Sequence, residues 1–314
     1  MEPAPLFEDV ADAPEGGTAW WLTADDGVRL RAAIWRDSAR EAPNGTIIIF
    51  PGRTEFIEKY GRAAGDLRAR GFDCAAVDWR GQGLADRLLA DAGAGHVEDF
   101  ADYQRDVAVF LELLDAQEMP QPWYLVGHSM GGCIGLRALH EGMPVRAAAF
   151  TGPMWKIAMA APLRPVARAL SRVSRPLGFG HLYAPGTEGQ NYVFTAPFED
   201  NTLTTDRDMW DYMSRQMAEH PELAIGGPSL HWLSEALREK VAVTSLPQPD
   251  LPILVMVGSE ERIVDRAAVE EIARSWPNAR MEVLEGGQHE IMMETPAIRG
   301  LCFDTMAEFF KGHR

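Results

Sequence analysis

The sequence predicts an α/β fold in which a mostly parallel sheet carries helices on both faces and an all-helical cap is inserted into the chain. Two observations predict it. From residue 46 to 150, short apolar runs alternate with longer amphipathic stretches, and the same alternation resumes from 253 to 311. Such strand–helix alternation indicates a parallel sheet. Between 152 and 245 the chain is rich in proline and aromatic residues, and its helical stretches lack intervening strands.

The segments before this interruption are assigned in order. Residues 18–36 are expected to form a β-hairpin around the turn DDG. TIIIF at 46–50 is short, apolar and β-branched, which suits a buried parallel strand. The amphipathic stretch at 56–71 suits a helix that a glycine ends. The same reasoning predicts strands at 72–79, 123–127 and 145–150, and helices at 99–116 and 129–142.

After the interruption, the alternation predicts strands at 253–257 and 279–287 and helices at 267–276 and 296–311. We therefore expect three parts. Residues 1–151 form the first part of an α/β core, residues 152–245 a helical cap or lid, and residues 246–314 the second part of the core. The cap is expected to cover the carboxyl edge of the sheet, where open α/β sheets bind their ligands.

The composition excludes several classes of protein. A net charge of −16 opposes a nucleic-acid partner, because phosphate binding needs basic patches. Three cysteines cannot all pair and show no metal-ligand spacing, so we expect neither a disulfide scaffold nor a metal. The first residues lack the pattern of a secretory signal, and no apolar run approaches the roughly 18 residues of a membrane span. We expect a cytoplasmic protein.

The strongest chemical signal is GHSMG, which fits the motif G-x-S-x-G between a predicted strand and a predicted helix. This motif lifts a serine hydroxyl out of a sharp turn, and Ser129 is therefore the expected nucleophile. Serine needs a general base. In this chain order the base follows the acid, and His289 lies after the last strand, at the edge where a base reaches Ser129.

An oxyanion hole for the tetrahedral intermediate is expected from two backbone N–H groups. One belongs to Met130, directly after the nucleophile, and the other to Arg53, in the loop after the strand at 46–50. The Arg53 guanidinium has a separate candidate role in binding a polar or anionic headgroup beside the ester. The alternative is a surface arginine paired with Glu55 or Glu58.

With these motifs in place, the chain resembles the lysophospholipase L2 and monoacylglycerol lipase branch of the α/β-hydrolases. The resemblance covers almost the whole chain from about residue 20 and rests on FPGRTEFIEKY, DWRGQGLADRL, GHSMGG, YAPG, NTLTTDRDMW, GGPSLHWL and GGQHEIMME. It implies an α/β-hydrolase fold and ester hydrolysis on single-chain lipids without a cofactor. It also implies Ser129 as nucleophile, His289 as base, and an oxyanion hole from Arg53 and Met130.

The acid of the triad is where the sequence departs from this group. Many relatives carry G-x-x-D after this strand, whereas the present chain has GSEE followed by RIVD. Glu261 stands in the aspartate's place, and we predict that it orients His289. Asp265 is the alternative acid, but it directly precedes a predicted helix and suits an N-cap. Glu260 is one residue out of register.

The cap is expected to decide the substrate. Its arginines at 164, 168, 172 and 175 share one helical face, suited either to lipid phosphates at an inner-membrane surface or to solvent. Candidate residues of an acyl channel, with the cap's own core as the alternative, are Met154, Trp155, Met159, Trp210, Tyr212, Met213, Met217 and Trp232. Asp78 is expected to hold its own loop.

Together these features predict a serine hydrolase that cleaves carboxylic esters of a lysophospholipid or a monoacylglycerol through an acyl-enzyme. Its partner is then a small-molecule lipid ester, with peripheral contact at the membrane surface as the role of the arginine stripe. The same triad also suits a thioester, a small aryl ester or a C–C bond. A non-catalytic binding protein with this fold would require a lost triad member.

Overall fold

The computed structural model describes residues 1–157 and 177–314. The arginine stripe at 164–175 and Met159 lie outside the described residues.

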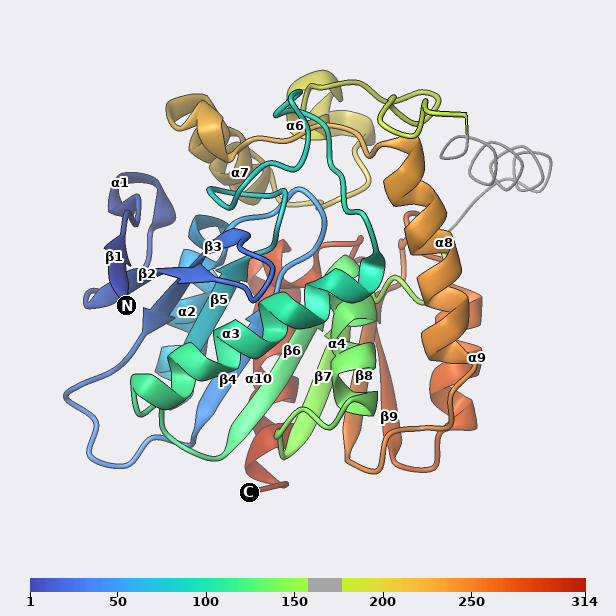
Figure 1. The fold of residues 1–314 in the computed structure, drawn as a ribbon. Helices are drawn as coiled ribbons and strands as arrows, with labels where there is room; N and C mark the ends of the chain where they lie inside the picture. Colours follow the sequence, from blue (N-terminus) through green and yellow to red (C-terminus); the bar gives the residue numbers. More distant parts are fainter. Residues whose placement is uncertain (158–176) are drawn as a thin grey trace.

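A mixed sheet forms the centre of the described chain (Figure 1). Its nine strands are arranged in the order β1-β2-β3-β5-β4-β6-β7-β8-β9 among the described residues. The strands from β4 to β9 pair in parallel, whereas β1, β2 and β3 add an antiparallel extension at one edge. The strands are β1 (Glu2–Ala4), β2 (Gly17–Thr23), β3 (Arg29–Trp35), β4 (Thr46–Phe50), β5 (Asp73–Asp78), β6 (Trp123–His128), β7 (Ala147–Thr151), β8 (Ile253–Gly258) and β9 (Ala279–Leu284).

Helices cover both faces of the sheet, as the strand–helix alternation predicted (Figure 1). One face packs against α3 (Tyr103–Ala116), α4 (Met130–His140), α8 (Leu230–Thr244) and α9 (Arg266–Ser275), and the other against α2 (Gly61–Ala69) and α10 (Pro296–Lys311). Each helix turns a stripe of apolar side chains inward. In α3, for example, Val107, Phe110 and Leu114 are buried. Within the two described ranges, every helix is too short or too polar to cross a bilayer.

The chain between β7 and β8 adds no strand to the sheet in its described part; α6 and α7 lie over the carboxyl ends of the strands, whereas α8 runs down one side of the sheet (Figure 1). Its described elements are α6 (Tyr192–Thr195), η3 (Phe198–Asp200), α7 (Arg207–Glu219), η4 (Pro221–Leu223) and α8. Side chains start these helices: Asp206 caps α7 and Ser229 caps α8. This placement positions the segment above the edge that carries the predicted nucleophile. The boundaries at 152 and 245 stay a prediction.

The first residues form elements that the sequence did not predict. β1 pairs with β2, and α1 (Glu8–Ala11) lies against α7. The carbonyl of Ala11 accepts a hydrogen bond from the Tyr212 hydroxyl at 2.7 Å, and the carbonyl of Val10 accepts one from Gln216 at 3.0 Å. The start of the chain thus connects the sheet edge to the helices above it.

The described ranges also contain the 3₁₀ helices η1 (Ile57–Tyr60), η2 (Phe100–Asp102) and η5 (Ile291–Met293).

A buried ion cluster holds the loops after β4 and β5 together. Arg31 donates two hydrogen bonds to Glu58, each 2.7 Å long, and one of 2.8 Å to Asp78. All three side chains are fully buried. Asp78 also accepts the N–H groups of Ile57 and Leu84, each at 2.8 Å. The prediction that Asp78 holds its own loop is therefore confirmed.

Replacing Arg31 with methionine is expected to destabilise the fold by about 3–5 kcal/mol, because it leaves Glu58 and Asp78 buried without their cation. The matched control is Arg29→Met on the same strand. Arg29 is half-buried over the Trp21 ring and pairs with exposed Glu2, so its loss should cost about 1 kcal/mol. Urea denaturation followed by tryptophan fluorescence measures both. Equal midpoints for the two variants would contradict this account of the cluster.

Candidate active site

Ser129 lies in a sharp turn between β6 and α4. Its backbone has φ 48° and ψ −114°, a conformation in which L-residues are strained. Gly131 allows the turn, because a Cβ there would lie 2.0 Å from the carbonyl oxygen of Phe50. The N–H of Ser129 donates to the Thr151 carbonyl at 3.0 Å, which fixes the turn to β7. The local sequence therefore holds the serine hydroxyl at the carboxyl edge of the sheet.

His289 lies in the loop between β9 and η5, at the same edge. The loop approaches β8 closely at Gly258, where a Cβ would lie 2.0 Å from the carbonyl oxygen of Gly287. The imidazole is buried, and its Nε2 lies 2.9 Å from the Ser129 Oγ. Its Nδ1 lies 2.7 Å from the Oε2 of Glu261. A carboxylate only accepts, so Nδ1 carries the proton and Nε2 is free to accept one from the serine.

The side chain of Glu261, in the turn after β8, is fully buried and faces His289. Its other oxygen, Oε1, accepts the N–H groups of Ile263 and Val264 at 2.6 and 3.1 Å. Burial alone would raise the pKa of Glu261, but the facing His289 and these hydrogen bonds outweigh it and place the pKa below its ordinary value. The carboxylate is therefore ionised at neutral pH and suited to stabilise an imidazolium.

The other two acids of this segment point elsewhere. Asp265 is the N-cap of α9 and accepts the N–H of Ala268 at 3.2 Å, with Lys156 at 3.7 Å. Glu260 is exposed and accepts a hydrogen bond from the Ser259 hydroxyl at 3.3 Å. The structure thus brings Ser129, His289 and Glu261 together. Their catalytic roles, and the choice of Glu261 over Asp265, remain predictions.

A cavity of about 260 Å³ opens beside Ser129 and His289. Both apolar and polar side chains line it. The apolar side chains are Phe56, Val193, Leu203, Met213, Met217 and Ile263, and the polar ones include Arg53, Thr54, Glu55, Lys59, Asn191 and Glu290. A site lined by both kinds of side chain suits an amphipathic ester.

Of the side chains expected to bind substrate, Met213 and Arg53 line this cavity, whereas the three tryptophans are not among its lining residues. Trp155 packs in the main core against Phe150 and Trp276, and its Nε1 donates to the Gly132 carbonyl at 3.1 Å. Trp210 packs in the apolar cluster to which Met213 belongs, and so lies behind the lining. Trp232 is buried, and its indole N–H donates to Tyr103 at 3.3 Å. Each ring buries a large apolar area and stabilises the fold, and a role of these residues in binding substrate stays a prediction.

The loop after β4, which is expected to supply half of the oxyanion hole, is held by several hydrogen bonds. The N–H of Gly52 donates to Glu55, and Gln82 bonds both the Gly52 carbonyl and the Thr54 N–H at 3.0 Å. Between Gly52 and Thr54, the N–H of Arg53 donates to no described residue. Met130, the other expected donor, is the first residue of α4. The oxyanion role of these two N–H groups stays a prediction.

The Arg53 side chain does not pair with Glu55 or Glu58, which rules out the surface-pair alternative. Its Nη1 donates to the Gly226 carbonyl at 2.7 Å, and its guanidinium lies 5.7 Å from the centre of the Trp232 ring. Glu55 bonds Lys59 and Tyr60, and Glu58 bonds Arg31. Arg53 thus reaches from the core loop to the cap segment.

Three of the polar lining residues, Glu55, Lys59 and Glu290, belong to a charged network that the sequence did not predict. Lys59 Nζ lies 2.7 Å from an oxygen of Glu55 and 2.7 Å from an oxygen of Glu290. His128 Nε2 lies 3.3 Å from Glu290 and 3.5 Å from Glu55. Its Nδ1 lies 2.9 Å from the Thr151 hydroxyl. The sequence carries only part of the signal: Glu55 and Lys59 are four residues apart, the spacing of a helical ion pair, but nothing in it links Lys59 to Glu290.

Opposite charges stabilise one another in this network. Burial alone would raise the pKa of Glu290, but Lys59 and His128 outweigh it and hold the pKa well below its ordinary value. Burial alone would lower the pKa of Lys59 and of His128, but the two carboxylates raise both. Glu55, His128 and Glu290 place potential metal ligands within 4.8 Å of one another. The Lys59 ammonium already lies between the carboxylates, so the cation of this cluster is a side chain.

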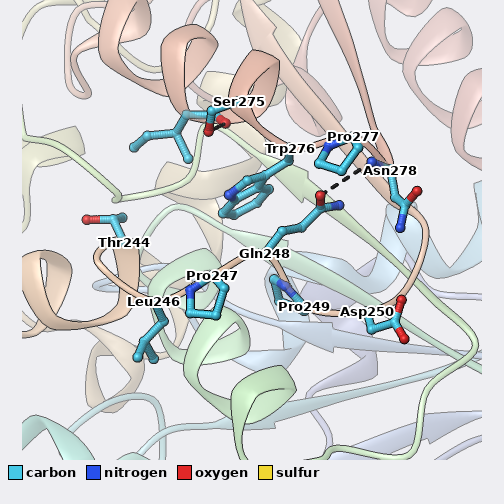
Figure 2. Close-up of a pocket in the computed structure, with 11 residues that line it drawn as sticks. Thr244, Leu246, Pro247, Gln248, Pro249, Asp250, Ser275, Trp276, Pro277 and Asn278 are labelled. Atoms are coloured by element: carbon cyan, nitrogen blue, oxygen red, sulfur yellow. Dashed lines mark hydrogen bonds between the residues drawn. The ribbon is translucent and has the colours of Figure 1, made fainter.

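A second hollow, of about 510 Å³, lies at the opposite edge of the sheet. Figure 2 shows its lining residues, which come from the segments leading into β8 and β9 and from the ends of α8 and α9. The Gln248 side chain accepts the N–H of Asn278 at 3.3 Å across it. Ser129 follows the carboxyl end of β6, so this hollow is remote from the site.

Comparison with known proteins identifies a family and several relatives that the chain is similar to. The family described as serine aminopeptidase, S33 matches residues 41–296. Lysophospholipase L2 of Escherichia coli (strain K12) is 34% identical over 305 residues, which cover 93% of this chain and 87% of that protein. Monoacylglycerol lipase of Mycolicibacterium smegmatis is 24% identical and covers 91% and 94% of the two chains. The structure of a soluble variant of monoglyceride lipase from Saccharomyces cerevisiae has a TM-score of 0.72 at 18% identity, covering 93% and 94%.

Proposed function

The chain belongs to the serine aminopeptidase S33 family of α/β-hydrolases, and from that premise we propose that it hydrolyses carboxylic esters of single-chain lipids. The lysophospholipase and monoacylglycerol lipase relatives support a lysophospholipid or a monoacylglycerol as the substrate. The observation that carries the proposal is the continuous hydrogen-bonded row Glu261–His289–Ser129, which ends in a cavity lined in part by apolar side chains.

In the proposed reaction, Ser129 Oγ attacks the ester carbonyl while His289 Nε2 takes the serine proton. The charge that develops on the carbonyl oxygen is stabilised by the N–H groups of Met130 and Arg53. The Glu261 carboxylate accepts a hydrogen bond from the Nδ1–H of His289 and so stabilises the imidazolium. His289 then gives its proton to the leaving alcohol. Water, activated by the same imidazole, releases the fatty acid and restores Ser129.

The acyl chain is proposed to lie against the apolar lining residues, two of which come from α7. Met213 and Met217 lie one helical turn apart on α7 and both line the cavity. Methionine side chains adapt to irregular apolar ligands because they are unbranched and flexible. The segment 152–245, which contains α7, would accordingly act as the cap over the substrate.

Activity on glycerol esters is expected to rise with acyl length from acetyl to octanoyl. Each methylene that leaves water contributes about 0.8 kcal/mol, which corresponds to roughly a four-fold increase in kcat/KM per methylene until the cavity is filled. Met213→Ala should flatten this dependence. Met143→Ala, at a buried methionine outside the cavity, is the control and should keep the slope. Steady-state kinetics on the matched esters measures the dependence of kcat/KM on acyl length. A preference for acetyl or butyryl esters would contradict the proposal of a lipid substrate.

A further inference from the structure

We propose that the Arg53 guanidinium binds the phosphate of a lysophospholipid and makes the enzyme prefer that substrate over a monoacylglycerol. This inference rests on the proposed function, because it concerns the alcohol side of the same ester. The two candidate substrates share the acyl chain and the glycerol ester, and they differ in the phosphate. A cation placed beside the scissile bond is therefore what would distinguish them.

The position of Arg53 meets this requirement. Its side chain lines the cavity that holds Ser129 and His289. Its backbone belongs to the loop expected to hold the ester oxygen, so the side chain starts beside the scissile bond. The guanidinium has one neutral acceptor, the Gly226 carbonyl, and the Trp232 ring near it. A guanidinium carries five N–H donors, which leaves several for a ligand.

The charge of Arg53 has no carboxylate partner among residues 1–157 and 177–314. Lys59, which also lines the cavity, differs in this respect, because it lies between Glu55 and Glu290. Those two acids are compensated by Lys59 and face His128 as well. Among the described lining residues, Arg53 is therefore the cation that a bound anion would neutralise.

Removing a guanidinium from water without a counterion is costly. Burial lowers the pKa of Arg53 to about 10, so the group is still charged at neutral pH. A phosphate supplies the missing counterion and fits the planar fork of donors in a bidentate arrangement. The free hydroxyls of a monoacylglycerol supply no charge.

Arg53 also connects the core loop to the cap, and a purely structural role predicts a different result. Loss of a structural contact lowers turnover of all esters alike, whereas loss of a phosphate contact lowers it selectively. Arg87 offers a matched control. Its Nη2 donates to the Glu222 carbonyl at 2.9 Å, burial lowers its pKa as well, and it lies outside the cavity lining.

The experiment compares octanoyl-lysophosphatidylcholine with octanoylglycerol, both as monomers, in wild type, Arg53→Met, Arg53→Lys and Arg87→Met. The ratio of kcat/KM for the two esters should fall about 10- to 100-fold in Arg53→Met, the range expected for loss of a charge-assisted hydrogen-bonded pair. Arg53→Lys should restore part of the ratio, and Arg87→Met should leave it unchanged. With wild type, sn-glycerol 3-phosphate should inhibit octanoylglycerol hydrolysis competitively where glycerol does not.

The outcomes separate this inference from the proposed function. If both esters are cleaved and the ratio is the same in wild type and Arg53→Met, the phosphate role is wrong and the lipid esterase stands. A wild-type preference for octanoylglycerol, or no inhibition by sn-glycerol 3-phosphate, also overturns it. If wild type cleaves neither ester, the proposed function fails and the inference fails with it.

Discussion

Ser129→Ala is expected to lower kcat by up to about 10⁶-fold, the size of loss found when the nucleophile of a serine triad is removed. The variant should fold like wild type. Alanine keeps the Cβ, so the strain at φ 48° is unchanged, and the N–H of residue 129 still bonds the Thr151 carbonyl. Only the hydroxyl beside His289 is lost. The measurement is steady-state hydrolysis of octanoylglycerol, with the residual rate compared with the uncatalysed reaction.

Ser275→Ala provides the control for this result. Ser275 lies on α9 beside the remote hollow of Figure 2, and its hydroxyl donates to the Ile272 carbonyl. The activity of the Ser275→Ala variant should stay within a few-fold of wild type. A fluorophosphonate probe should label native wild type and Ser275→Ala, but neither Ser129→Ala nor heat-unfolded protein. Near-wild-type turnover by Ser129→Ala would disprove the acyl-enzyme mechanism.

Glu261→Gln is expected to lower kcat by about 10⁴-fold, comparable with conversion of the triad acid to its amide in other serine hydrolases. A glutamine loses the charge that stabilises the imidazolium. Its NH₂ group can also face Nδ1, which favours the tautomer with the proton on Nε2, pointing at the serine. Asp265→Asn should cost less than about ten-fold, because asparagine caps a helix as well as aspartate does.

The comparison between these two variants decides the acid. Both exchange a carboxylate for an amide in the same turn after β8, so their charge changes are equal. Steady-state kcat on one ester, with unfolding midpoints to show that both variants are folded, measures it. A larger loss in Asp265→Asn would move the acid to Asp265 and leave the serine and the histidine in place.

Several elements and site residues follow directly from local patterns in the sequence. The last helix was predicted, from the strand–helix alternation, at the residues where α10 forms, and Pro296 at its first turn suits this start. The turn around Ser129 was predictable because only glycine fits at residue 131. Glu261 could be placed by counting from Gly258, since a turn after a buried strand fixes which side chain faces inward.

Other features depend on contacts between distant residues, and the sequence pattern does not contain them. β1 and α1 are three and four residues long, and their own propensities are too weak to predict them. They form because β2 and α7 supply hydrogen-bond partners. The pair Lys59–Glu290 joins residues 231 positions apart, and charged residues in isolation read as solvated. The aromatic rings of the cap carry no signal that separates a cavity wall from a packed core.

The contact between α1 and α7 has a consequence for engineering the range of substrates. One side of α7 places Met213 and Met217 in the lining of the cavity, while Tyr212 donates to the carbonyl of Ala11 and Gln216 to the carbonyl of Val10. Substitutions among the first dozen residues are therefore expected to shift α7 without altering Ser129, His289 or Glu261. Under the proposed binding mode of the acyl chain, libraries of such variants would change chain-length selectivity from outside the cavity.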